Sequence, residues 1–186
     1  LTDDAIALIE ERDQERPFFL NLWHYAVHEP IEAPQHLIDY YREKAKKWGL
    51  DGIDPIVDSG EEVRFVDPGK KPRTILRRQV QSLPEYAAMV HHLDESVGRL
   101  IAALKERGLW ENTLFVFTSD NGGVSSHSQA APFTCNHPWS EGKGWSEEGG
   151  MRVSYIFSWP GHIPEGKLLR ESIVSMDLFP TFLHAA

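Results

Sequence analysis

The sequence predicts an α/β fold, specifically an α/β/α sandwich around a mostly parallel mixed sheet. Along the 186 residues, short runs rich in β-branched and aromatic residues alternate with amphipathic helical segments, a pattern typical of parallel sheets covered by helices. Several of the apolar runs also stop abruptly at polar residues, where ligands bind in open α/β sheets. The chain begins at Leu1 rather than Met and ends within a predicted helix, so we expect one incomplete domain.

The first part of the chain predicts a helix, a strand and a second helix. Thr2 is a suitable cap for a helix over residues 3–12, whose first turn is acidic. The apolar run 18–23 predicts a buried strand that leads to polar residues, His28 among them. A second helix is expected over about 35–48, with four residues on its apolar face: Leu37, Ile38, Tyr41 and Ala45.

Residues 49–81 sustain neither the helical nor the strand period. Gly, Pro and Asp recur, which predicts a long surface excursion with little fixed structure of its own. The end of this segment is basic, and the cations are Lys70, Lys71, Arg73, Arg77 and Arg78. One interpretation is a solvated charged face, and the other is an outer subsite for an anionic substrate.

The longest predicted helix begins after this excursion. Ser82 and Glu85 have the spacing of a capping box, and Pro84 suits the first turn. Apolar residues then recur every three to four positions as far as Leu104, and Gly108 suits the exit from the helix.

The last third predicts two strands and a closing helix. The strands are expected over 113–119 and 151–159, with a polar loop to about residue 145 between them. The closing helix is expected over 177–185.

Composition excludes several classes of protein. A net charge of −9, from 28 acidic and 19 basic residues, argues against a general nucleic-acid binder. It does not exclude an anionic substrate, because a metal or a local cluster can override the global field. The single cysteine, Cys135, excludes an internal disulfide framework and a cysteine-rich zinc site. No apolar stretch approaches the roughly 20 residues that span a bilayer.

Asp120 and Asn121 are the strongest functional candidates. They follow the apolar run 113–119, and two glycines after them let the backbone turn tightly. Carboxylate and amide oxygens are the ligands that Ca²⁺ and Mg²⁺ prefer, although Asp-Asn-Gly by itself is also a common turn sequence. The sequence therefore predicts a cation site at this strand end, with a simple turn as the alternative.

Two further loops are expected at the same edge of the sheet. His28 follows the first predicted strand, and Lys143 lies between two glycines before the last one. Taken singly, each has a plain alternative, a satisfied loop histidine and an exposed lysine. Together, a cation site, an acid/base group and a fixed ammonium are what hydrolysis of an anionic ester requires.

Five ordered motifs cover most of the chain. They are the Pro-Phe-Phe-Leu run and His-x-Pro loop within 16–34, the helix at 86–100, the Phe-Thr-Ser-Asp-Asn-Gly-Gly run at 117–123, the Gly-Lys-Gly to Trp-Pro-Gly segment at 142–161, and Asp-Leu-Phe-Pro-Thr at 177–181. In this order they closely resemble the type I sulfatases of the alkaline-phosphatase-like superfamily. The resemblance implies that Asp120 and Asn121 ligate Ca²⁺ or Mg²⁺, and that His28 and Lys143 contact the sulfate and assist its leaving group.

The chain departs from this family in one important respect. The family's nucleophile is a formylglycine made from a Cys or Ser in a Cys/Ser-x-Pro/Ala-x-Arg motif, and Cys135 lies in Thr-Cys-Asn-His-Pro, which does not fit. We therefore expect the formylglycine, and the family's Asp-Asp metal pair, in an N-terminal half that these residues do not contain. Cys135 is interpreted as a loop thiol. A smaller departure is Ser154, where Pro is usual.

The predicted function follows from this resemblance. Residues 1–186 are interpreted as a partial sulfatase catalytic domain, inactive alone, whose parent protein hydrolyses a sulfated small molecule or carbohydrate. The resemblance also implies a periplasmic or secreted protein. Two alternatives stay open: a phosphodiesterase or phosphonate-ester hydrolase of the same superfamily, and a non-catalytic metal-binding remnant.

Overall fold

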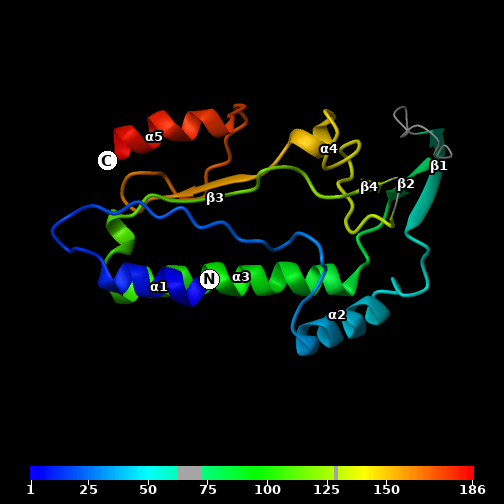
Figure 1. Ribbon diagram of the computed structural model, residues 1–186, viewed down its shortest axis with the longest axis horizontal. Coiled ribbons are helices and arrows are strands. Elements are labelled where there is room, and N and C mark those ends of the chain that lie inside the picture. Colours follow the sequence, from blue (N-terminus) through cyan, green and yellow to red (C-terminus); the bar gives the residue numbers. More distant parts are fainter. Residues whose placement is uncertain (63–72, 128–129) are drawn as a thin grey trace. The chain divides into compact units, whose positions relative to one another are not determined.

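The computed structural model describes residues 1–62, 73–127 and 130–186, and Figure 1 shows the order of its helices and strands. The chain divides into two compact units, which are described separately. The first comprises Leu1–His24, Glu95–Phe117 and Tyr155–Ala186, and the second comprises Tyr25–Asp94 and Thr118–Ser154. The long helix α3 (Pro84–Glu106) contributes residues to both units.

In the first unit, helix α1 (Thr2–Glu11) lies along the later part of α3 (Figure 1). Ala5 and Ile9 of α1 are buried against Leu100 and Leu104 of α3, so the apolar spacing of each helix produces one shared core. The helix predicted over 3–12 is confirmed. The predicted Thr2 cap is wrong, because Thr2 is already helical and its hydroxyl lies 2.5 Å from that of Ser96 on α3.

The segment 18–23 is not a buried strand, and this prediction is wrong. Leu20 and Leu22 are half-buried against the core of the first unit, whereas Phe19 is 71% exposed and Trp23 is 81% exposed. No strand of the described residues pairs with this segment. Without a hydrogen-bonded neighbour it stays an extended chain with one face toward the core.

The remaining elements of the first unit follow the sequence closely. A short 3₁₀ turn, η1 (Trp110–Asn112), leads into strand β3 (Phe115–Thr118), which pairs with β5 (Tyr155–Ser158) in a two-stranded sheet. Both strands lie inside their predicted ranges and are shorter. Another 3₁₀ turn, η2 (Ser175–Asp177), precedes the closing helix α5 (Leu178–Ala185), which confirms the helix predicted over 177–185.

In the second unit, helix α2 (Gln35–Lys47) packs against the beginning of α3. Leu37 and Ile38 are buried beside Ala88, which confirms the predicted apolar face. Pro84 opens α3 as predicted. The capping box is wrong, because the Ser82 hydroxyl donates to the Val80 carbonyl at 3.5 Å and accepts from Arg78 at 3.3 Å rather than capping the helix.

The segment 49–81 contains regular structure that the sequence analysis did not predict. Strand β1 (Ile56–Glu62) pairs antiparallel with β2 (Thr74–Arg78), and β2 pairs antiparallel with the short strand β4 (Ser126–His127), giving the order β1-β2-β4. The prediction of little fixed structure is wrong because a neighbour distant in the sequence completes the pairing. Helix α4 (Glu148–Met151) is a single short turn in the same unit.

The basic run at the end of this segment has two kinds of surroundings. Lys70 and Lys71 lie outside the described residues, and Arg73 is exposed. Arg77 and Arg78 turn inward, since Arg77 pairs with two carboxylates and Arg78 is 8% exposed. A solvated face is therefore the wrong interpretation for these two arginines.

Among the described residues, no helix is long and apolar enough to cross a membrane.

Candidate functional site

The turn after β3 presents the two candidate metal ligands. Asp120 is exposed and Asn121 is half-buried. The Asn121 Nδ2 donates to the Gly122 carbonyl at 2.9 Å, and the Ser119 hydroxyl donates to the Asn121 carbonyl at 2.9 Å. The first of these bonds holds the nitrogen of the Asn121 amide on the backbone, which leaves the Oδ1 as the atom available to a cation.

Five glycines hold this turn against two later segments. The Gly122 N–H donates to the Gly150 carbonyl at 2.8 Å, and a Cβ on Gly122 would lie 1.7 Å from the Gly149 carbonyl oxygen. A Cβ on Gly142 would lie 2.2 Å from the Gly123 oxygen. Backbone thus touches backbone, which only glycine permits. We call the set the glycine junction: Gly122, Gly123, Gly142, Gly149 and Gly150.

Lys143 is attached directly to the same junction. Its backbone N–H donates to the Gly123 carbonyl at 3.1 Å. Lys143 as a whole is half-buried. The neighbouring Gly144 has φ +89°, a conformation that suits glycine and turns the chain sharply after the lysine. The structure therefore brings the segments that carry Asp120, Asn121 and Lys143 side by side.

His28 is held differently. It is exposed, its Nδ1 lies 3.0 Å from the carbonyl oxygen of Glu29, and its ring stands 5.3 Å from that of Tyr25. In the described part of the chain, no hydrogen bond joins His28 to the Asp120 turn or to the lysine segment. The predicted convergence of His28 with the other three residues therefore stays a prediction.

The donors at the turn fit part of a hard-cation site. A carboxylate and an amide oxygen are of the type that Ca²⁺ and Mg²⁺ take, and Ca²⁺ binds about six to eight oxygens. Within the described residues, no three His, Cys, Asp or Glu side chains gather in a potential metal site. Asp120 and Asn121 thus supply two ligands of the right kind and leave the rest of the shell to other groups.

Sequence reasoning missed the polar residues that support this site. Glu141 precedes the Gly-Lys-Gly segment, is buried, and accepts a hydrogen bond from the Arg77 Nε at 2.8 Å. The pKa of Arg77 is raised, first by its hydrogen bond to Glu61 and then by that to Glu141. The Asn136 Nδ2 and the Ser125 backbone N–H both donate to the Gly123 carbonyl of the glycine junction. None of these residues belongs to a local pattern, so the sequence carries no signal for them beyond the basic run that includes Arg77.

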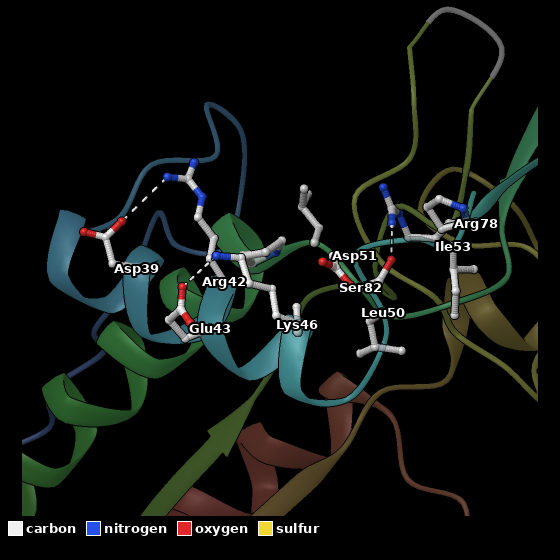
Figure 2. A pocket seen from close by; sticks show the side chains of 13 residues that line it. Asp39, Arg42, Glu43, Lys46, Leu50, Asp51, Ile53, Arg78 and Ser82 are labelled. Atoms are coloured by element: carbon white, nitrogen blue, oxygen red, sulfur yellow. Dashed lines mark hydrogen bonds and ion pairs between the residues drawn. The ribbon is translucent and has the colours of Figure 1, made fainter.

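Figure 2 shows a cavity of about 570 Å³ elsewhere in the second unit, beside α2 and the start of α3. Its rim carries ion pairs, Asp39 with Arg42 at 3.6 Å and Glu43 with Lys46 at 2.8 Å. Arg78 also lines it, and burial lowers the pKa of that guanidinium. None of the four candidate residues lines this cavity, so it is distinct from the candidate site.

Comparison with known proteins identifies the family. The family model described as Sulfatase matches residues 1–186, and the chain belongs to the sulfatase family. It is 28% identical over 190 residues to an arylsulfatase of Clostridium perfringens, which covers all of this chain and 37% of that protein. A sulfatase of Formosa agariphila is 32% identical over 196 residues, which is 29% of its length. The N-acetylgalactosamine-6-sulfatase of Sus scrofa is 42% identical over 103 residues, or 54% of this chain and 19% of that protein. The chain therefore spans well under half of these relatives.

Solved structures agree with this assignment. Ps i-CgsB, in complex with k-i-k-neocarrahexaose, matches with a TM-score of 0.71 and 30% identity over 99% of this chain and 32% of its own. The putative sulfatase YidJ of Bacteroides fragilis matches with a TM-score of 0.68 and 28% identity, over 98% of this chain and 35% of its own. These neighbours confirm the predicted α/β class of the alkaline-phosphatase-like type.

Proposed function

We propose that the full-length protein hydrolyses sulfate esters, and that this chain contributes part of the metal site and a leaving-group cation. One observation carries the proposal: the Lys143 N–H bond to the Gly123 carbonyl, inside the glycine junction, ties the candidate lysine to the turn of Asp120 and Asn121. A sulfated carbohydrate is the proposed substrate class. Two similar proteins support it: a relative is an N-acetylgalactosamine-6-sulfatase, and a structural neighbour was solved in complex with k-i-k-neocarrahexaose.

Asp120 and Asn121 would hold a Ca²⁺ or Mg²⁺ ion through carboxylate and amide oxygens. When bound, such an ion neutralises sulfate oxygens and orients the nucleophile. The task of this chain is to fix the two oxygens. It does so at Asn121 through the hydrogen bond that the side-chain Nδ2 donates to the Gly122 carbonyl.

Lys143 and His28 would act on the leaving alcohol. An ammonium close to the bridging ester oxygen stabilises the negative charge that develops there. His28 has its Nδ1 3.0 Å from the Glu29 carbonyl oxygen. In the protonated ring both nitrogens carry a hydrogen. With the Nδ1–H donating to Glu29, the Nε2–H is the group that would donate to the departing oxygen.

The nucleophile would come from outside these residues. Cys135 stands in a sequence that does not match the formylglycine motif, and its backbone N–H is held by Gln81 at 2.7 Å. We propose a formylglycine in another part of the protein. The isolated 186 residues should then show no sulfatase turnover and bind Ca²⁺ only weakly, and submicromolar Ca²⁺ affinity in calorimetry would contradict this.

The role of Lys143 is tested by Lys143→Ala in the full-length protein. We expect kcat to fall by about 100-fold on sulfate esters with poor leaving groups, the scale for loss of one electrostatic donor. Activated aryl sulfates should be affected much less, since their leaving groups need little stabilisation. Lys167→Ala, at an exposed lysine, is the matched control. If Lys143→Ala turns over each substrate type at the wild-type rate, the leaving-group role of Lys143 is refuted.

The same assay separates the sulfatase proposal from a phosphodiesterase in the same fold. Matched aryl sulfate and phosphodiester substrates share a leaving group and differ in the reacting centre. Higher kcat/KM on the sulfate supports the proposal, and higher kcat/KM on the phosphodiester favours the alternative.

A further inference from the structure

Asn136 stands at the centre of the glycine junction. Its Nδ2 lies 2.9 Å from the Gly123 carbonyl oxygen, 3.1 Å from that of Glu141 and 3.0 Å from that of Gly149. The Ser125 hydroxyl oxygen is a fourth neighbour at 3.2 Å. An amide nitrogen has two hydrogens, so these acceptors share them, and one side chain joins three separate backbone segments.

The three carbonyls come from functionally distinct places. Gly123 ends the turn that carries Asp120 and Asn121, Glu141 stands two residues before Lys143, and Gly149 packs under Gly122. Three carbonyl oxygens that converge on one point repel each other unless a donor lies between them. The Gly123 carbonyl also accepts from the backbone N–H groups of Lys143 and Ser125, and the Glu141 carbonyl accepts from the Ser125 hydroxyl. The Asn136 amide is the donor that joins the Gly149 carbonyl to these two.

We infer that Asn136 is a positioning residue, which sets the spacing between the Asn121 oxygen and the Lys143 ammonium by clamping the carbonyls of Gly123, Glu141 and Gly149. It has no contact with the reacting atoms in this scheme and acts through the two loops. The inference rests on the proposed function, since it assigns a purpose to that spacing.

Gln81 provides a control for general loosening of the loop. Its Oε1 accepts hydrogen bonds from the Thr134 hydroxyl at 2.6 Å and from the Cys135 N–H at 2.7 Å. Gln81→Ala therefore frees the residues next to Asn136 without removing a donor from the glycine junction. A purely structural role for Asn136 predicts that the two variants behave alike at equal loss of stability.

The experiment compares Asn136→Ala and Gln81→Ala in the full-length protein, assayed below their melting temperatures. We expect Asn136→Ala to reduce kcat on sulfate esters with poor leaving groups by about 10- to 100-fold, and to raise the Ca²⁺ concentration for half-maximal activity over a similar range. Gln81→Ala should keep the wild-type leaving-group dependence and Ca²⁺ requirement. Asn136→Ser, which retains one donor, should recover part of the loss and serves if the alanine variant does not fold.

The outcomes separate two failures. If Lys143→Ala impairs the poor leaving groups but Asn136→Ala matches Gln81→Ala in both readouts, the clamp is overturned and the proposed function stands. If Lys143→Ala changes nothing, the leaving-group role proposed for Lys143 is overturned, and the clamp loses its purpose.

Discussion

The glycine junction and the loop around His28 (residues 25–30) carry two halves of one predicted chemistry but are built in opposite ways. The junction is formed by backbone against backbone, and Asn136 and Ser125 satisfy its converging polar groups. In the His28 loop, Tyr25 and His28 are exposed, and the His28 N–H donates to the Tyr25 carbonyl at 2.9 Å while the two rings are in contact. The junction is thus pre-organised for its role, whereas the hydrogen bonds described for His28 join it to Tyr25 and Glu29 of its own loop.

The largest expected effect comes from filling the junction with Gly122→Ala. The new methyl group would meet the Gly149 carbonyl 1.7 Å away, and since both partners are backbone, the segments must separate. We expect a loss of about 3 kcal/mol in the free energy of unfolding, the upper range for overpacking, measured by urea denaturation.

Gly98→Ala is the matched control for that prediction. Gly98 lies exposed in α3, and no atom lies within 4 Å of the point that its Cβ would occupy. Alanine there should add about 0.5–1 kcal/mol to stability through helix propensity. Equal effects of the two substitutions would contradict the packing argument.

A smaller effect is expected from Glu141→Gln, which weakens the attachment of the lysine segment to β2. The Glu141 side chain is 7% exposed, and Arg77 donates to it from Nε and Nη2. Loss of a partly buried charged hydrogen bond should cost about 2 kcal/mol. Glu61→Gln removes a partner of the same arginine whose side chain is 64% exposed, so it should cost under about 1 kcal/mol. If thermal melts show a larger loss of stability for Glu61→Gln than for Glu141→Gln, then Glu61 and not Glu141 is the more important partner of Arg77.

The smallest effect concerns pH at the entrance to the His28 loop. Burial lowers the pKa of His24, whose Nε2 lies 3.3 Å from the Ser96 hydroxyl. The folded protein therefore takes up this proton at lower pH than the unfolded chain, whose histidine titrates near about 6.5. The contribution of His24 to the free energy of unfolding is therefore fully present above about pH 6.5, and it declines as the pH falls below that value.

His24→Gln should flatten this dependence in urea midpoints measured at neutral and mildly acidic pH. Tyr25→Ala, at an exposed ring, should leave the slope unchanged and alter stability by less than about 0.5 kcal/mol. A slope that persists in His24→Gln would assign the dependence to another group.

Local pattern was sufficient for helices α1, α2, α3 and α5 and for the strand before the candidate metal turn. The spacing of Leu37 and Ile38 in α2, and of Leu100 and Leu104 in α3, predicted residues that are buried. The run that ends at Asp120 contains β3. Local pattern failed at 18–23, where apolar residues are exposed on one side, and at β1 and β2, because β2 also pairs with β4, which lies far away in the sequence.

The sequence by itself determined the family, the order of the elements and the identity of Asp120, Asn121, Lys143 and His28 as candidates, because short motifs and helical periods are local properties. Only the tertiary structure decided which of these lie together. It places the Asp120 turn beside Lys143 through glycine backbones and the Asn136 amide. Close backbone approach and shared hydrogen bonds depend on the path of distant segments, and no local spacing encodes that path.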